Sequence, residues 1–149
     1  MTNKELADLI YPNITKTVED YEKEYPKRDL PEGAVVTRYA PSPTGFIHIG
    51  ALYASFVSQA FARQTNGVFY LRIEDTDTKR TIDNGINKII EGLKEYNVNF
   101  DEGPIDDEGN SNGSYGPYIQ SEREDIYKAF VKHLIEQGLA YPCSVHQKS

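Results

Sequence analysis

Between residues 35 and 95 the hydrophobic pattern alternates between two periods, and this alternation limits the folds open to the chain. Segments rich in β-branched and aromatic residues predict strands at about 35–39 and 68–73. Apolar residues three and four positions apart predict helices at about 50–64 and 79–95. The order strand, helix, strand, helix predicts an α/β fold with a parallel sheet and right-handed crossovers. Two strands do not complete such a sheet, so further strands have to come from elsewhere.

Each of the two predicted helices carries an apolar stripe on one face, as is typical of a helix that packs against a core. The dipeptide Asn66-Gly67 predicts the turn that follows the first helix. The stripe of the first helix consists of Ile49, Leu52, Phe56, Val57, Ala60 and Phe61, and that of the second of Ile82, Ile86, Ile89, Ile90 and Leu93.

The segments on either side of this pattern are interpreted from their capping and turn residues. Residues 1–33 form an N-terminal appendage without evident chemistry, in which residues 17–25 predict a charged surface helix. Residues 97–118 are rich in glycine, asparagine, aspartate and proline, and they predict a long loop with a short strand at 98–100.

A further helix, which carries apolar residues from Ile126 to Ile135, is predicted after this loop. Ser121 and Glu124 have the spacing of a capping box, and Gly138 supplies a stop. Residues 139–143 then predict the start of a strand.

Composition narrows the class of protein. The 149 residues, 38% of them hydrophobic, suffice for one folded domain with a core. No apolar segment approaches the roughly 20 residues of a membrane span, and the N-terminus is charged, so no membrane association and a cytoplasmic location are expected. The single cysteine, Cys143, fits a reducing compartment. A net charge of −7 argues against binding nucleic acid through overall charge, so any RNA contact would be local.

Charged residues lie where the two predicted strands end, and parallel strands bring such residues into one crevice. Arg38, in the first strand, suits bidentate pairing with a carboxylate. Glu74, which follows the second strand, suits an ammonium group. Together they fit a zwitterionic amino acid with an additional acidic group. The alternative is a structural ion pair between Arg38 and Glu74 themselves.

The start of the first helix offers a phosphate site next to these residues. Backbone N–H groups at a helix N-terminus carry a partial positive charge, and His48 and Gly50 lie beside them. The alternative for a lone His-x-Gly is an ordinary strand-to-helix turn with a surface histidine. Asp75 and Asp77 have a comparable alternative as helix-capping acids.

The reaction that such a site serves is narrowed by the motifs that the sequence lacks. No histidine has a neighbouring serine or cysteine at a motif spacing, and Ser42 lies in a proline-rich loop. Neither Gly-x-Gly-x-x-Gly nor the Gly-Lys-Ser/Thr loop occurs, which argues against dinucleotide redox chemistry and common ATPases. A nucleophile that arrives already ionised needs neither motif. Attack of a substrate carboxylate on the α-phosphorus of ATP is a reaction of this kind.

Five motifs follow one another between about residues 35 and 143. They are Arg38-Tyr-Ala-Pro-Ser-Pro-Thr-Gly45 with His48-Ile-Gly-Ala51, Leu71-Arg-Ile-Glu-Asp-Thr-Asp77, Asp101-Glu-Gly-Pro104, Gly116-Pro-Tyr-Ile-Gln-Ser-Glu-Arg123, and Ala140-Tyr-Pro-Cys143. In this order and at this spacing they resemble the N-terminal part of bacterial glutamyl-tRNA synthetases, which are class I aminoacyl-tRNA synthetases.

The resemblance implies a Rossmann-like, parallel-sheet nucleotide-binding fold that activates glutamate with ATP and transfers it to tRNA. By position, Arg38 would bind the side-chain carboxylate of glutamate and Glu74 its ammonium group. Ala40 and Ser42 would line the amino-acid pocket.

The same resemblance implies residues for the other two substrates. Thr44, His48 and Gly50 would contact ATP, which enters with Mg²⁺, and His48 and Gly50 would be the catalytic residues. Arg80 is a weaker candidate for contact with the acceptor end of tRNA.

The sequence departs from the family pattern in two places. Ala51 stands where the signature tetrapeptide has its second histidine. Ser144 and Val145 follow Cys143 where zinc-binding members have a second cysteine, so no metal site and no zinc are expected.

The resemblance also implies a domain organisation. Residues 34–112 would form the first half of the catalytic domain, which is incomplete, and residues 113–149 the start of an inserted acceptor-binding domain, with residues 1–33 as the appendage. The second half of the nucleotide fold, its lysine-bearing ATP loop and the anticodon-binding domains have no match. We therefore expect a truncated glutamate–tRNA ligase that is inactive or nearly so by itself. The alternatives are a non-catalytic module that binds ATP or glutamate, and a small nucleotidylyltransferase.

Overall fold

The computed structural model describes residues 1–45, 47–77 and 79–143, which form two compact units. One unit is Lys27–Arg123, and the other combines Met1–Pro26 with the segment that begins at Glu124. These units divide the chain at other positions than the domains expected above, whose assignment stays a prediction. None of the helices in the described part has the length and apolar character that crossing a membrane requires.

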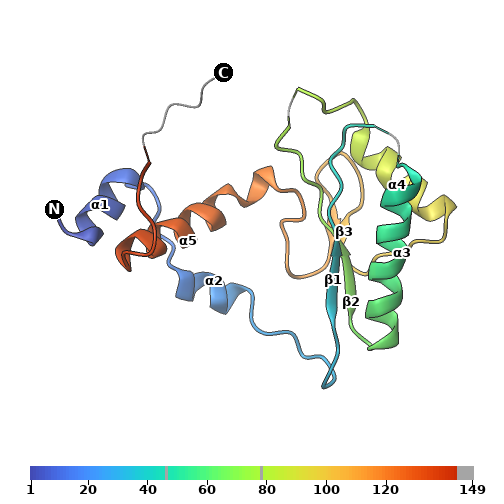
Figure 1. Ribbon diagram of the computed structural model, residues 1–149, viewed down its shortest axis with the longest axis horizontal. Coiled ribbons are helices and arrows are strands. Elements are labelled where there is room, and N and C mark those ends of the chain that lie inside the picture. Colours follow the sequence, from blue (N-terminus) through green and yellow to red (C-terminus); the bar gives the residue numbers. More distant parts are fainter. Residues whose placement is uncertain (46, 78, 144–149) are drawn as a thin grey trace. The chain divides into compact units, whose positions relative to one another are not determined.

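The larger unit is built on two parallel strands, visible at its centre in Figure 1. Strand β1 (Val36–Tyr39) pairs with β2 (Val68–Leu71), and Val36 stands opposite Val68 in the register. Parallel neighbours need a crossover, and the helix α3 (Ile49–Gln64) provides it. The predicted α/β arrangement with a parallel sheet is therefore confirmed.

The second edge of β2 is occupied by two short segments from later in the chain. The N–H of Leu71 donates to the carbonyl of Glu102 at 2.8 Å, and the N–H of Ile73 donates to that of Tyr118 at 2.9 Å. These contacts form isolated parallel bridges beside β2. The additional strand-like chain expected from the sequence thus comes from the segment after residue 100.

The short strand predicted at 98–100 is wrong. Val98 is fully buried in the core, and its N–H donates to the carbonyl of Leu93 at 2.9 Å, which closes the turn after a helix. The strand pairing lies a few residues further on, where β3 (Gly103–Pro104) and β4 (Ser111–Asn112) form an antiparallel pair.

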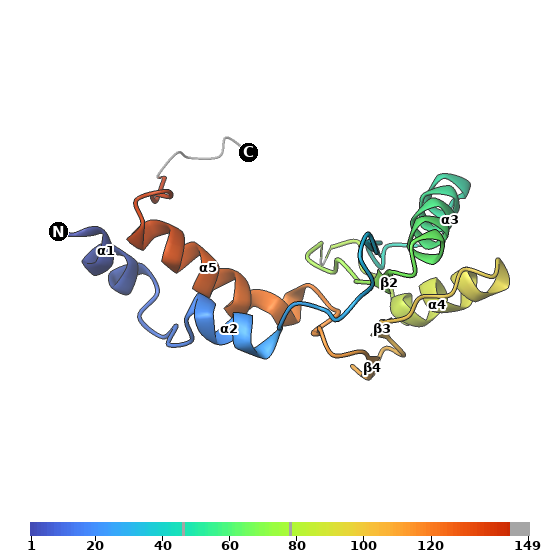
Figure 2. The same ribbon diagram turned by 90° about the horizontal axis from the view of Figure 1, so that it is seen from below.

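Helix α3 and helix α4 (Gly85–Glu95) lie on the same side of β1 and β2, as Figures 1 and 2 show. Their inward side chains join those of β2 in one hydrophobic core. This core consists of Ala62, Phe69, Leu71, Ile73, Ile89, Ile90, Leu93 and Val98.

The apolar stripe predicted for α3 is mostly exposed in the described part of the chain. Of that stripe only Leu52 is buried, whereas Ile49 is 82% and Phe61 52% exposed. The side of α3 that is buried carries the small residues Ser55 and Ala62. Two strands cover only a narrow strip of a helix, so the larger side chains beside that strip remain in solvent.

Helix α4 starts later than the predicted residue 79. Asn84 has a left-handed backbone conformation, with φ of 59°, which a continuous helix does not contain. The N–H of Ile82, two residues before this break, donates to the carbonyl of Pro43 at 3.0 Å and ties the segment to the loop after β1. The segment between β2 and α4 is therefore a tethered turn.

The smaller unit contains α1 (Asn3–Ile10), α2 (Val18–Glu24) and α5 (Glu124–Glu136). Lys132 of α5 holds the N-terminal segment through its ammonium group, which lies 2.8 Å from Asp8 and donates to the carbonyl of Ile14 at 3.1 Å. The surface helix predicted at 17–25 is confirmed as α2.

Helix α5 ends as predicted and begins differently. Gly138 has φ of 72°, and the N–H of Leu139 donates to the carbonyl of Leu134 at 2.9 Å, which is the geometry of a glycine stop. Ser121 opens a short 3₁₀ helix, η1 (Ser121–Arg123), and its hydroxyl donates to Asp75 in place of the predicted capping box. Residues 139–143, predicted to start a strand, contain none, and residues 144–149 lie outside the described part.

A partly buried ionic cluster joins the start of the larger unit to its later loop. The guanidinium of Arg28 forms an ion pair with Glu102 and stacks 3.7 Å above the ring of Tyr115. The hydroxyl of Tyr118 donates to Glu102 at 2.8 Å, and desolvation raises the pKa of this phenol to about 12. The hydrogen bond from Arg28 lowers the pKa of Glu102 below its ordinary 4.5.

The lowered pKa predicts how stability depends on pH. A carboxyl group with a depressed pKa in the folded state stabilises the fold above its unfolded pKa, and this contribution is lost as pH falls through the folded pKa. We expect Arg28→Met to lower the free energy of unfolding by about 2 kcal/mol at pH 7. We also expect a flatter acid limb below about pH 4.5.

The measurement is urea unfolding at pH 7, 5, 4 and 3. Lys16→Met is the matched control, because it removes an ion pair with Glu24 whose side chains are 53% and 43% exposed. We expect this control to change stability by no more than about 1 kcal/mol. Equal effects of the two variants on the acid limb would contradict the assignment to Arg28 and Glu102.

Candidate active site

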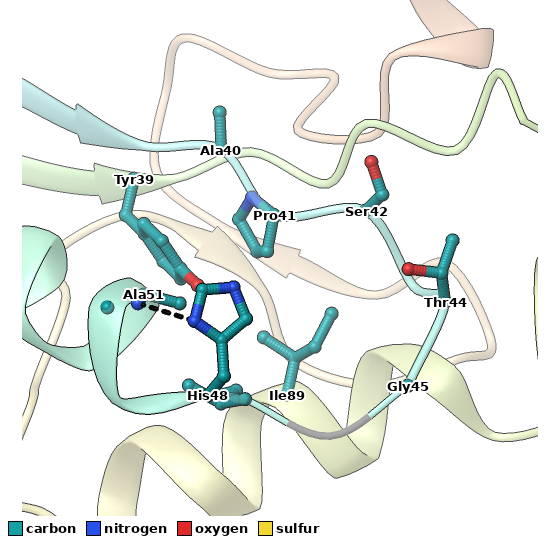
Figure 3. Close-up of a pocket in the computed structure, with 11 residues that line it drawn as sticks. Tyr39, Ala40, Pro41, Ser42, Thr44, Gly45, His48, Ala51 and Ile89 are labelled. Atoms are coloured by element: carbon teal, nitrogen blue, oxygen red, sulfur yellow. Dashed lines mark hydrogen bonds between the residues drawn. The ribbon is translucent and has the colours of Figure 1, made fainter.

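A hollow lies where the loop after β1 meets the N-terminus of α3, and Figure 3 shows the residues around it. Its volume is about 460 Å³, which suits a small organic ligand. Ile89 of α4 forms part of the lining, together with the loop. The complete lining is Tyr39, Ala40, Pro41, Ser42, Thr44, Gly45, Ile47, His48, Gly50, Ala51 and Ile89.

His48 caps α3 with its own side chain. Its Nδ1 accepts a hydrogen bond from the N–H of Ala51 at 3.3 Å, drawn as the dashed line in Figure 3. Because Nδ1 accepts, the proton of the neutral ring is on Nε2, which is then the donor. The ring stands next to Tyr39 and Pro41 in Figure 3. The imidazole thus adds an N–H donor to a helix end that already favours anions.

Gly50 leaves room for this imidazole. A Cβ at Gly50 would lie 3.3 Å from both Cε1 and Nδ1 of His48, which is tighter than ordinary van der Waals contact. The glycine therefore permits the ring position that the cap requires. Thr44 lies across the hollow in Figure 3, so the three residues expected to contact ATP line one cavity.

Arg38 and Glu74 lie together next to this cavity but do not line it. Nη1 of Arg38 is 3.6 Å from Oε1 of Glu74, and both side chains are about one third exposed. Nη2 of Arg72 lies 3.5 Å from the same oxygen. The ion pair that was the alternative interpretation is therefore present. The cluster holds two guanidinium groups for one carboxylate, so it has positive charge to spare for an anion.

Two backbone hydrogen bonds connect this cluster to the cavity wall. The N–H of Glu74 donates to the carbonyl of Pro41 at 2.9 Å, and the N–H of Arg72 donates to that of Tyr39 at 3.0 Å. Since Tyr39 and Pro41 line the cavity, the backbone of Glu74 is hydrogen-bonded directly to a residue of its wall. Ala40 and Ser42, expected to bind glutamate, lie in the same wall.

Arg80 neither lines the cavity nor pairs with Glu74. Its side chain is 74% exposed and pairs at 2.6 Å with Asp77, which therefore serves a local turn. Among the described residues no three histidine, cysteine, aspartate or glutamate side chains are grouped to hold a metal ion. The expectation that zinc is absent stays a prediction.

The sequence of this site matches a described family. Residues 34–149 match the family model of the catalytic domain of class I tRNA synthetases (E and Q). The chain belongs to that family. This match argues against the alternative that the chain is a small nucleotidylyltransferase.

Individual relatives agree with the family. The glutamate–tRNA ligase of Clostridium perfringens strain 13 is 55% identical over 143 residues, and that of Acetivibrio thermocellus is 54% identical over 145. Each alignment covers 96% of this chain and 26% of the relative. The chain thus spans about a quarter of the length of these relatives.

A solved structure agrees with the fold. The glutamate-tRNA synthetase from Elizabethkingia anophelis superposes with a TM-score of 0.62 at 39% identity. The superposition covers 69% of this chain and 20% of that one. A second structure, from Elizabethkingia meningosepticum, has the same score and identity and is described as a complex with its amino acid.

Sequence reasoning did not single out Arg72 or Tyr39. Arg72 precedes Glu74 by two residues, and side chains two apart in extended chain share a face, so the spacing was a usable signal. Tyr39 is half-buried beside His48, and desolvation raises the pKa of its hydroxyl. A tyrosine at a strand end carries no comparable signal in the sequence.

Proposed function

We propose that this chain provides the glutamate and ATP sites of a glutamate–tRNA ligase. One observation carries the proposal. The loop after β1 connects a cationic cluster, formed by Arg38 and Arg72 around Glu74, to the start of α3, which favours anions. Arg38 and Arg72 lie 3.6 and 3.5 Å from Glu74, and His48 caps α3 at the end of the cavity-lining loop that follows β1.

In this proposal Arg38 leaves Glu74 and binds the side-chain carboxylate of glutamate. Glu74 keeps its ion pair with Arg72 and accepts hydrogen bonds from the substrate ammonium group. An arginine forms two parallel hydrogen bonds with a carboxylate, so this exchange replaces a 3.6 Å ion pair with a better one. Ala40 and Ser42, in the intervening wall, are small enough to leave space for the amino acid.

ATP is proposed to lie over Thr44, His48 and Gly50 as its magnesium complex. The α-carboxylate of glutamate attacks the α-phosphorus, an oxygen–phosphorus bond forms, and pyrophosphate leaves with the electron pair of the broken bond. The Nε2–H of His48 and the N–H groups at the start of α3 would stabilise the charge on the phosphates. The glutamyl group then passes to the terminal adenosine of tRNA, for which Arg80 is a candidate contact.

Glutamate-dependent ATP–pyrophosphate exchange, with tRNA supplied, tests the proposal. We would measure the 149-residue chain itself and the same residues joined to the remaining three quarters of the Clostridium perfringens relative. We expect no exchange from the first and exchange from the second that requires glutamate and ATP. Activity with cytidine triphosphate, or without glutamate, would contradict the assignment. Saturable binding of ATP and glutamate without exchange in the completed protein would establish a binding module instead.

A further inference from the structure

Glu74 is held from both sides by backbone hydrogen bonds of its neighbours. On one side its own N–H donates to Pro41, in the loop after β1. On the other side Ile73 donates to the carbonyl of Tyr118 and accepts from the N–H of Gln120, each at 2.9 Å. The chain that carries Glu74 is therefore clamped between a cavity-lining loop and the segment 118–120.

The next residue extends this clamp through its side chain. Asp75 accepts two hydrogen bonds from Ser121, one from the N–H at 2.9 Å and one from the hydroxyl at 2.5 Å. Both go to an ionised carboxylate, a class of hydrogen bond about twice as strong as a neutral one. Asp75 and Ser121 are 46 residues apart in sequence, so the contact fixes two distant segments to each other.

Resting on the proposed function of Glu74, we propose that the Asp75–Ser121 link is a positioning device for glutamate recognition. Without the Asp75–Ser121 link, the chain directly after Glu74 has no hydrogen bond to a distant segment among those described. The Glu74 carboxylate can then rotate away from the substrate ammonium group. A displacement of about 1 Å is enough to reduce binding or rate substantially. Neither residue lines the cavity, so Asp75 and Ser121 are positioning residues in this proposal.

The first readout needs no activity. We would measure amide hydrogen exchange of the 149-residue chain in Asp75→Asn and Ser121→Ala. We expect the Glu74 amide to exchange at least about 10-fold faster in both variants, with the amides of Ile90 and Leu93 in the core unchanged. Asp106→Asn is the matched control, because the carboxylate of Asp106 likewise accepts backbone N–H groups, those of Glu108 and Asn110, but lies in the β3–β4 hairpin. Unchanged exchange at Glu74 would overturn the proposal.

The second readout is kinetic, in the completed protein described above. We expect Asp75→Asn and Ser121→Ala to raise the KM for glutamate about 10-fold and to leave the KM for ATP unchanged. Ser121→Thr, which keeps the hydroxyl, should restore the glutamate KM. A purely structural link would lower the yield of folded enzyme without this selective change.

Glu74→Gln separates the two proposals. If it raises the glutamate KM while Asp75→Asn and Ser121→Ala do not, the positioning role is wrong and the function of Glu74 stands. If Glu74→Gln itself leaves the glutamate KM unchanged, the proposed function of Glu74 fails, and with it the positioning role, whatever the exchange rates.

Discussion

Gly67→Ala is expected to lower the free energy of unfolding of the larger unit by about 3 kcal/mol or more. A Cβ at this position would lie 1.9 Å from the carbonyl oxygen of Val35 and under 3 Å from its carbonyl carbon and nitrogen. That backbone cannot retreat easily. The N–H of Val35 donates to the hydroxyl of Thr65 at 3.0 Å, and its carbonyl accepts from Val68 at 3.2 Å. Relief of the clash therefore breaks the first contacts between β1 and β2.

Urea unfolding followed by circular dichroism measures this effect. Gly92→Ala is the matched control, because the Cβ there meets only the flexible end of Ile47, at 3.2 Å. Alanine also favours a helix over glycine by about 1 kcal/mol, which offsets a small shift of that side chain. We expect the control to remain within about 1 kcal/mol of the unchanged chain. A similarly small effect of Gly67→Ala would show that β1 and β2 tolerate a different pairing.

Arg38→Ala is expected to raise the KM for glutamate at least 100-fold in the completed protein, with the KM for ATP little changed. Two hydrogen bonds to a charged partner are lost, and each contributes about 1.5–3 kcal/mol. The substitution also leaves Glu74 with Arg72 as its remaining ion-pair partner among the described residues. ATP–pyrophosphate exchange at varied glutamate concentration gives both constants.

Two variants complete this experiment. Arg38→Lys keeps the charge but not the planar pair of donors, so we expect an intermediate effect of about 10-fold. Arg63→Ala is the control. Arg63 is an exposed arginine near the C-terminal end of α3, away from His48, and it pairs with Asp101, so we expect an unchanged KM for glutamate. Equal KM values for Arg38→Ala and the Arg63 control would show that Arg38 only stabilises the fold through its ion pair with Glu74.

The elements with a complete local signal were predicted from the sequence. Strands β1 and β2, the helix α3 and the stop at Gly138 all carry their periodicity or their turn residues in the segment itself. The predicted start of α4 was wrong because the apolar spacing was continued from Ile82 across the dipeptide Asn84-Gly85, which is the same turn signal as Asn66-Gly67 and has the same left-handed asparagine. The exposed stripe of α3 was unpredictable because periodicity identifies an apolar face without identifying what covers it.

For the candidate site, too, the parts with a local sequence signal were predicted and the contacts between distant segments were not. The residues around the helix start, including Ser42, Thr44 and His48, are close in sequence, so their convergence on one cavity followed from a single loop. Arg38 and Glu74 were placed together by the rule that parallel strands end at one edge, and they lie 3.6 Å apart. The contact between Asp75 and Ser121 joins segments that no local pattern relates. The chemical roles of all these site residues stay predictions.

The smaller unit has a consequence for the order in which a growing chain can fold. Lys132 contacts Ile14 across 118 residues of sequence, whereas the residues of the larger unit are contiguous from Lys27 to Arg123. During synthesis the first 26 residues leave the ribosome long before α5 exists. The larger unit can therefore close while α1 and α2 still lack their partner, so residues 1–26 are made before the larger unit but are among the last residues to reach their native contacts.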